Sequence, residues 1–151
     1  MNDNRAARST ATLVIGMTAT IALAGCGLRE GVHEKTNGHV KTVDYATGAA
    51  GKTDAHAHLP SWVPDQARSV SEAIRTTGSE RILRFTVDHP KALAACRPGG
   101  ASPTSATLSA AWWPSGQESK TDRVCATDWH VLMQGTTVYA YQPETLPRPS
   151  S

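Results

Sequence analysis

The chain of 151 residues lacks several features by which functions are recognised in sequences. Its formal net charge is only +2, so it has no basic excess of the kind that nucleic-acid binding requires, and we expect no nucleic-acid partner. It contains neither a G-x-S-x-G nucleophile motif nor a C-x-x-C metal motif, and we nominate no catalytic residue. These absences favour a protein that is not an enzyme.

The one long apolar run lies near the N-terminus. It extends over 14 residues, from Ala11 to Ala24, whereas a helix that crosses the hydrocarbon core needs about 20. The polar residues before it include Arg5 and Arg8. A basic segment, a short apolar run and then small residues predict an export signal over residues 1–25 that is removed from the mature protein.

The end of this signal resembles the lipobox of bacterial lipoproteins, with the residues Leu23-Ala24-Gly25-Cys26. The resemblance implies that Cys26 receives a diacylglycerol on its sulfur and becomes the first residue after cleavage. Its partner would then be membrane lipid, and the protein would lie on the outer face of the cell membrane. The alternative is an ordinary secretory signal with an incidental cysteine.

Two cysteines remain after Cys26, at Cys96 and Cys125. An even pair in an exported domain favours a disulfide, because the compartment outside the membrane is oxidising. The alternative is two free, buried thiols. We expect a Cys96–Cys125 disulfide that stabilises a small domain.

Composition divides the chain after Cys26 into a linker and a domain. Residues 26–57 are predicted to be a flexible linker, because their only apolar order is the patch of Val40, Val43 and Tyr45. Residues 58–147 predict one small domain, and residues 148–151 a polar tail.

Alternating apolar residues predict five strands, at residues 70–76, 81–88, 107–113, 123–133 and 137–142. Residues 65–77 also fit a helix, but Gly78 favours a hairpin with 81–88. Residues 90–96 predict one short helix that begins at a proline. The expected fold class is therefore α+β, a small antiparallel sheet of about five strands with one short helix on one face.

The domain resembles small secreted lipoproteins of actinobacteria. The stretches that carry the resemblance are Leu59-Pro60-Ser61-Trp62-Val63-Pro64, Thr77-Gly78-Ser79-Glu80-Arg81-Ile82-Leu83-Arg84, Trp112-Trp113-Pro114 and Val138-Tyr139-Ala140-Tyr141. They cover most of residues 59–142, but the resemblance implies no particular activity and carries no functional residue over.

Residues 46–53 fit a loose P-loop pattern that ends in Gly51-Lys52-Thr53. A P-loop needs a helix directly after the motif, so that its N-terminus receives the phosphate. Residues 54–60 show no helical pattern and contain Pro60. We therefore expect linker here and no bound nucleotide or other cofactor.

Residues 54–59 resemble the metal motif of amidohydrolases through His56 and His58. In an extended segment the two imidazoles would point to the same side. That chemistry belongs to a barrel of about 250 residues, for which this chain has no room. We expect a solvated His pair without a metal, and keep a cell-envelope hydrolase or metal-dependent enzyme using His56 and His58 as the alternative function.

The aromatic residues are four Trp, three Tyr and one Phe, and this excess of Trp and Tyr is typical of contact surfaces. Trp112 and Trp113 are adjacent in a predicted strand and would leave it on opposite faces. We expect one in the core and the other on a contact surface, unless both pack structurally. The leading hypothesis is a non-catalytic envelope lipoprotein that binds an envelope protein or a wall component. A further alternative is a structural or stress-related envelope component with no specific ligand.

Overall fold

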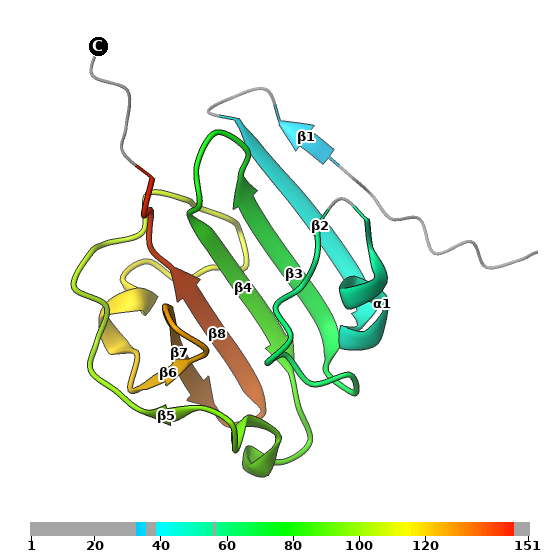
Figure 1. Cartoon of the computed structure of the whole chain (residues 1–151), viewed down its shortest axis with the longest axis vertical. Coiled ribbons are helices and arrows are strands. Elements are labelled where there is room, and N and C mark those ends of the chain that lie inside the picture. The colour runs from blue at the N-terminus through cyan, green and yellow to red at the C-terminus, as the bar shows by residue number, and fades with distance from the viewer. Residues whose placement is uncertain (1–32, 36–38, 56, 147–151) are drawn as a thin grey trace, which may run out of the picture.

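One antiparallel sheet organises the chain in the computed structural model, which describes residues 33–35, 39–55 and 57–146 (Figure 1). Its strand order is β1-β2-β3-β4-β8-β7-β6-β5. The strands are β1 (His33–Lys35), β2 (Val40–Thr47), β3 (Arg68–Arg75), β4 (Arg81–Thr86), β5 (Arg97–Pro98), β6 (Arg123–Cys125), β7 (Trp129–Gln134) and β8 (Thr137–Gln142). The helical elements are α1 (Gly48–Thr53) and the 3₁₀ turns η1 (Pro90–Leu93) and η2 (Gln117–Lys120).

The predicted fold class, α+β with about five strands and one short helix on one face, is wrong. The described chain is mostly sheet, and its single α-helix has six residues. The expected helix at 90–96 is only the four-residue turn η1. No helix in the described ranges has the length and apolar character needed to cross a bilayer.

The predicted linker, residues 26–57, contains part of the folded domain. Strand β2 pairs with β3, and Val43 and Tyr45 on β2 are buried. Helix α1 follows directly and is capped by Thr47, whose Oγ1 accepts a hydrogen bond of 3.2 Å from the amide of Ala50. Composition misled the prediction because β2 receives its hydrogen bonds and its apolar cover from residues far along the chain.

Two other predicted strands also differ from the structure. Residues 107–113 form no strand, and the expected strand at 123–133 is two strands, β6 and β7, joined by a turn. Ala126 in that turn has a φ of +53°, which breaks the extended backbone. The hairpin of β3 with β4 is confirmed, as is the hairpin of β7 with β8, where Gly135 adopts a φ of +60°.

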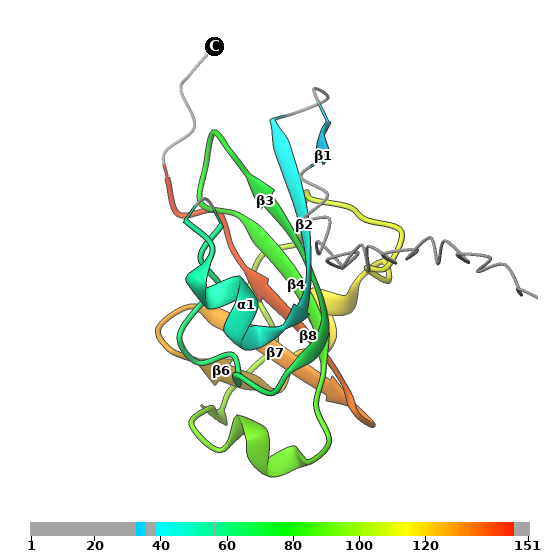
Figure 2. The same cartoon turned by 90° about the vertical axis from the view of Figure 1, so that its right-hand side faces the viewer.

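Both faces of the sheet are buried. On the first face lie Leu83, Phe85 and Val131, covered by α1 and by the segment that contains Leu59 and Val63. On the second face lie Ala73, Ile82 and Tyr141, covered by a loop that contributes Leu108 and Trp113. Figure 2 shows α1 and η2 on opposite sides of the sheet. The one short helix that was expected on one face is therefore not what buries the sheet, because α1 with its following segment covers the first face and an irregular segment covers the second.

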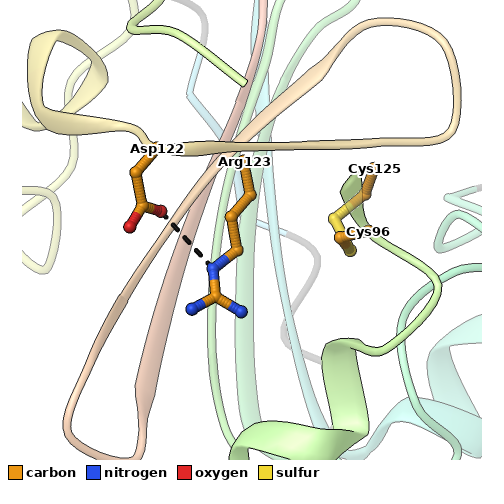
Figure 3. The surroundings of a disulfide bond; sticks show 4 residues. All are labelled: Cys96, Asp122, Arg123 and Cys125. Carbon is orange, nitrogen blue, oxygen red and sulfur yellow. Dashed lines mark ion pairs between the residues drawn. A yellow bond between two sulfur atoms is a disulfide. The ribbon is translucent and has the colours of Figure 1, made fainter. Parts of the chain in front are cut away.

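The predicted disulfide between Cys96 and Cys125 is confirmed, with Cα atoms 4.3 Å apart. Figure 3 shows it beside Asp122 and Arg123, whose side chains form an ion pair of 3.5 Å. Cys125 is fully buried in the first-face core, whereas Cys96 is half-buried and packs against that core. The bond holds the segment after η1, with the two-residue edge strand β5, against β6.

We expect replacement of both cysteines, Cys96→Ala with Cys125→Ala, to lower the free energy of unfolding by about 3–4 kcal/mol, because the disulfide closes a loop of about 30 residues. Urea denaturation of the variant and of the oxidised protein measures the difference. The reduced wild-type protein is the matched control and should show the same loss. A loss below about 1 kcal/mol in both would contradict this role for the bond.

Candidate functional site

A cleft of about 350 Å³ opens at the end of the sheet where β3 ends and β4 begins. Its walls come from the segment after α1, from the β3–β4 turn and from the end of β8. The lining residues are Ala57, His58, Ile74, Gly78, Ser79, Arg81 and Gln142. The start of β2 lies at the same end of the sheet, because Val40 is paired with Arg75 (Figure 1).

The turn that forms one wall is held by the carboxylate of Glu144. This carboxylate accepts hydrogen bonds from the amide of Ser79, at 2.9 and 3.1 Å, and from its hydroxyl, at 2.8 Å. Desolvation alone would raise the pKa of Glu144, but hydrogen bonds from the amides of Ser79 and Leu146 lower it to about 2. A Cβ at Gly78 would lie 1.9 Å from a Glu144 carboxylate oxygen, so a larger residue there would displace this side chain. Hydrogen bonds to Glu144 therefore fix the turn that forms this wall of the cleft.

Behind the cleft, Glu72 lies within the first-face core. It is fully buried, and its cross-strand neighbours are Val43 on β2 and Leu83 on β4. Arg81 Nη2 lies 2.5 Å from Glu72 Oε1. Among the described residues, Arg81 is the only cation that pairs with this carboxylate, and no hydrogen bond from another residue supports either oxygen.

Burial raises the pKa of Glu72 from 4.5 to about 7, and the positive charge of Arg81 offsets only part of the effect. The carboxyl group therefore titrates near neutral pH. A shifted carboxyl beside a cleft marks a candidate functional site, although a buried ion pair can also be purely structural. The accessible partner in the cleft, Arg81, distinguishes this pair from one sealed inside the core.

Arg81 connects Glu72 with the cleft. Its Nη2 donates a hydrogen bond of 2.8 Å to the carbonyl of His58, and its guanidinium carbon lies 5.6 Å from the centre of the Trp129 ring. Trp129 is held in turn by Trp62, edge to face at 5.6 Å. The Nε of Arg81 is buried without a hydrogen-bond partner in the part of the chain that the structure describes. The side chain is 20% exposed, toward the cleft.

The sequence-based site residues lie in different places. Cys26 and His56 are outside the described residues. His58 is exposed at the cleft rim, where its Nδ1 lies 3.2 Å from the carbonyl of Lys52. Within residues 33–35, 39–55 and 57–146, no group of three His, Cys, Asp or Glu side chains is arranged to hold a metal ion. Metal-dependent chemistry at His56 and His58 stays an untested alternative.

The P-loop pattern does not form a phosphate-binding loop. Gly51, Lys52 and Thr53 lie inside α1 rather than before a helix, and Lys52 Nζ binds Asp65 Oδ1 at 2.7 Å. Gly51 is needed for packing, because a Cβ there would lie 2.3 Å from the Leu59 side chain. The glycines of this pattern therefore serve the close approach of α1 to the core.

Trp112 and Trp113 lie in the loop over the second face and not in a strand, so the argument from strand alternation was wrong. Trp113 is buried, with its ring 5.9 Å from that of Tyr139. Trp112 is half-buried, 5.5 Å from the guanidinium of Arg84 and edge to face with Trp113. The predicted contact surface is thus reduced to Trp112, and its role in binding stays a prediction.

Sequence reasoning did not nominate Glu72 and Arg81. A signal was present, because Glu72 shares the apolar side of a strand with Val70 and Ile74. A charged residue on such a side needs a partner, but Arg81 could be found only from the strand register.

Comparison of the chain with protein-family models, with curated proteins and with solved structures gave no significant match. The cleft and the Glu72–Arg81 pair are therefore interpreted from their own geometry.

For Glu72→Gln we expect a stability that depends less on pH. In the wild type, the folded protein keeps the Glu72 proton up to about pH 7 while the unfolded chain loses it near 4.5. Unfolding free energy should therefore fall as pH rises between these values, by about 3 kcal/mol at about 1.4 kcal/mol per pKa unit. Urea denaturation of the wild type and of Glu72→Gln at about pH 4 and pH 8 measures this change in unfolding free energy. If the wild type and Glu72→Gln differ in unfolding free energy by the same amount at both pH values, the raised pKa of Glu72 would be contradicted.

The two tryptophans should respond differently to truncation. Trp113→Ala removes a buried ring from the second face and should cost about 3–5 kcal/mol of stability. Trp112→Ala, at the half-buried position, should cost about 1 kcal/mol, mainly the contact with Arg84. Denaturation curves of both variants make the comparison, and equal losses would show that Trp112 is as structural as Trp113.

Proposed function

We propose that this protein is a membrane-anchored lipoprotein on the outer face of the cell membrane, with a non-catalytic domain that binds an envelope protein or a wall component. The observation that carries the anchor is the run Leu23-Ala24-Gly25-Cys26 directly after an uncharged apolar segment. The Cys96–Cys125 disulfide supports export, because such bonds persist in oxidising compartments.

The position of β1 limits how far the anchor can hold the domain from the membrane. If Cys26 is the first residue, only residues 27–32 separate it from His33, where β1 begins and pairs with Thr42 on β2. Six residues span at most about 20 Å when fully extended. The end of the sheet with the cleft would then lie near the bilayer surface, where envelope ligands are within reach.

The binding role is supported by the cleft and by the half-exposed Trp112. The cleft presents the guanidinium of Arg81 together with apolar surface from Ala57 and Ile74. A concave site in which a few polar groups lie beside apolar side chains is the usual form of a small-ligand site.

We expect the intact mass of the membrane-bound protein to correspond to a chain that starts at Cys26 and carries an added diacylglycerol. Cys26→Ala should release the protein from membranes or leave an unprocessed precursor, because the thiol accepts the lipid. Mass spectrometry and membrane fractionation test this, with Cys96→Ala as a control that keeps Cys26. A processed Cys26→Ala protein that still sediments with membranes would overturn the anchor.

A further inference from the structure

Arg81 and His58 are the two basic side chains among the residues that line the cleft. Within the described part of the chain, Nη2 makes the hydrogen bond and the ion pair of the Arg81 guanidinium. The Arg81 side chain is 20% exposed and lines the cleft. A partly desolvated guanidinium in a cleft is a strong binding group for a planar or tetrahedral oxyanion.

Glu72, the counter-ion of Arg81, has few partners that stabilise its negative charge. A second buried glutamate, Glu80, gives the comparison. Glu80 accepts hydrogen bonds from the amides of Thr107, at 2.6 Å, and Leu108, at 3.2 Å, and pairs with Arg75 at 2.9 Å. Glu72 has Arg81 as its one ion-pair partner among the described residues. Near neutral pH a substantial share of Glu72 is therefore protonated, which leaves the Arg81 charge uncompensated.

We propose that the cleft binds a small ligand through its carboxylate or phosphate group on Arg81, and that Glu72 takes up a proton when the anion binds. The anion replaces Glu72 as the counter-charge of Arg81 and repels the Glu72 carboxylate, so the neutral carboxyl is favoured in the complex. The remainder of the ligand packs against Ile74, the partly exposed apolar side chain of the lining. The inference rests on the proposed binding role but not on the lipid anchor.

Other charged groups on the elements around Glu72 form no ion pair with it among the described residues. From β2 comes Lys41, on the same face of the sheet and paired in register with Ile74. The other groups are His58 at the cleft rim, Lys52 in its pair with Asp65, and Asp128, whose carboxylate accepts a hydrogen bond from Gln142. Since Arg81 is the one residue in the described ranges that forms an ion pair with Glu72, the proton uptake of Glu72 is assigned to the loss of this pair.

The coupling between anion binding and protonation of Glu72 makes the affinity for the anion depend on pH in one direction. Anion binding raises the pKa of Glu72 above its value of about 7 in the free protein. Affinity is therefore highest below about pH 7, falls as pH rises through the interval between the free and bound pKa values, and levels off above the bound value. Between pH 6 and pH 8 the dissociation constant should increase about five- to tenfold.

The test is an NMR titration of the full-length protein, purified from the cells that produce it, at constant ionic strength. The probes are sodium acetate and sodium sulfate, which stand for a carboxylate and a phosphate group and do not themselves titrate between pH 6 and pH 8. The Trp129 indole signal reports binding, because this ring lies beside the Arg81 guanidinium. Saturation by one probe but not the other identifies the ligand group.

Three variants separate this proposal from non-specific anion binding. Glu72→Gln should bind with the low-pH affinity of the wild type at every pH. Glu72→Gln combined with Arg81→Met removes both charges of the pair together, should remain folded, and should lose saturable binding. Arg84→Met is the matched control, because Arg84 is also half-buried on β4 but contacts Trp112 over the other face, and it should bind as the wild type does.

Absence of saturable binding by either anion would overturn the proposal, as would a pH dependence that persists in Glu72→Gln. Equal weakening in Arg84→Met and in the double variant would also overturn it. Each result is independent of the mass of the lipidated chain, so failure of this inference and failure of the membrane anchor are distinguishable.

Discussion

The Glu80 carboxylate holds in place the irregular segment that closes the second face of the sheet. The amides of Thr107 and Leu108 donate to it, and the Arg75 guanidinium pairs with it across the β3–β4 turn. These bonds lower the pKa of Glu80 although burial acts to raise it. The hydroxyl of Tyr141 adds a hydrogen bond of 3.2 Å to the carbonyl of Ser105, and Leu108 and Trp113 of the same segment are buried against the sheet. A satisfied buried charge and apolar packing together therefore close the second face.

Glu72, on the other face of the β3–β4 hairpin, is buried without the hydrogen bonds that stabilise the Glu80 carboxylate. It is as deeply buried as Glu80, but its support is one ion pair, and its pKa is raised to about 7 instead of lowered. A buried carboxylate with so few partners costs stability unless it is protonated. The β3–β4 hairpin thus carries a structural glutamate on one side and a titrating one on the other. That asymmetry makes the cleft the best candidate for a function.

Local patterns predicted the parts of the fold that depend on neighbouring residues. The β3–β4 and β7–β8 hairpins followed from alternation and from glycine at the turns, and the disulfide followed from the number of cysteines after Cys26. Strand β2 was missed because its burial depends on pairing with β3, more than twenty residues along the chain. Residues 107–113 have the alternation of a strand because a loop that lies on a sheet also alternates apolar and polar side chains.

By itself, the sequence determined the apolar alternation that makes a sheet, the cysteine pair and the residues that resemble a lipobox. These are properties of composition and of spacing along the chain. Only the tertiary structure decided that Val43 and Tyr45 belong to the core, that Trp112 and Trp113 lie on the same face, and that Arg81 reaches Glu72. Each of these depends on strand register and on which segment covers which face. Such pairings follow from the packing of the whole chain, because distant residues supply both the partner and the desolvation.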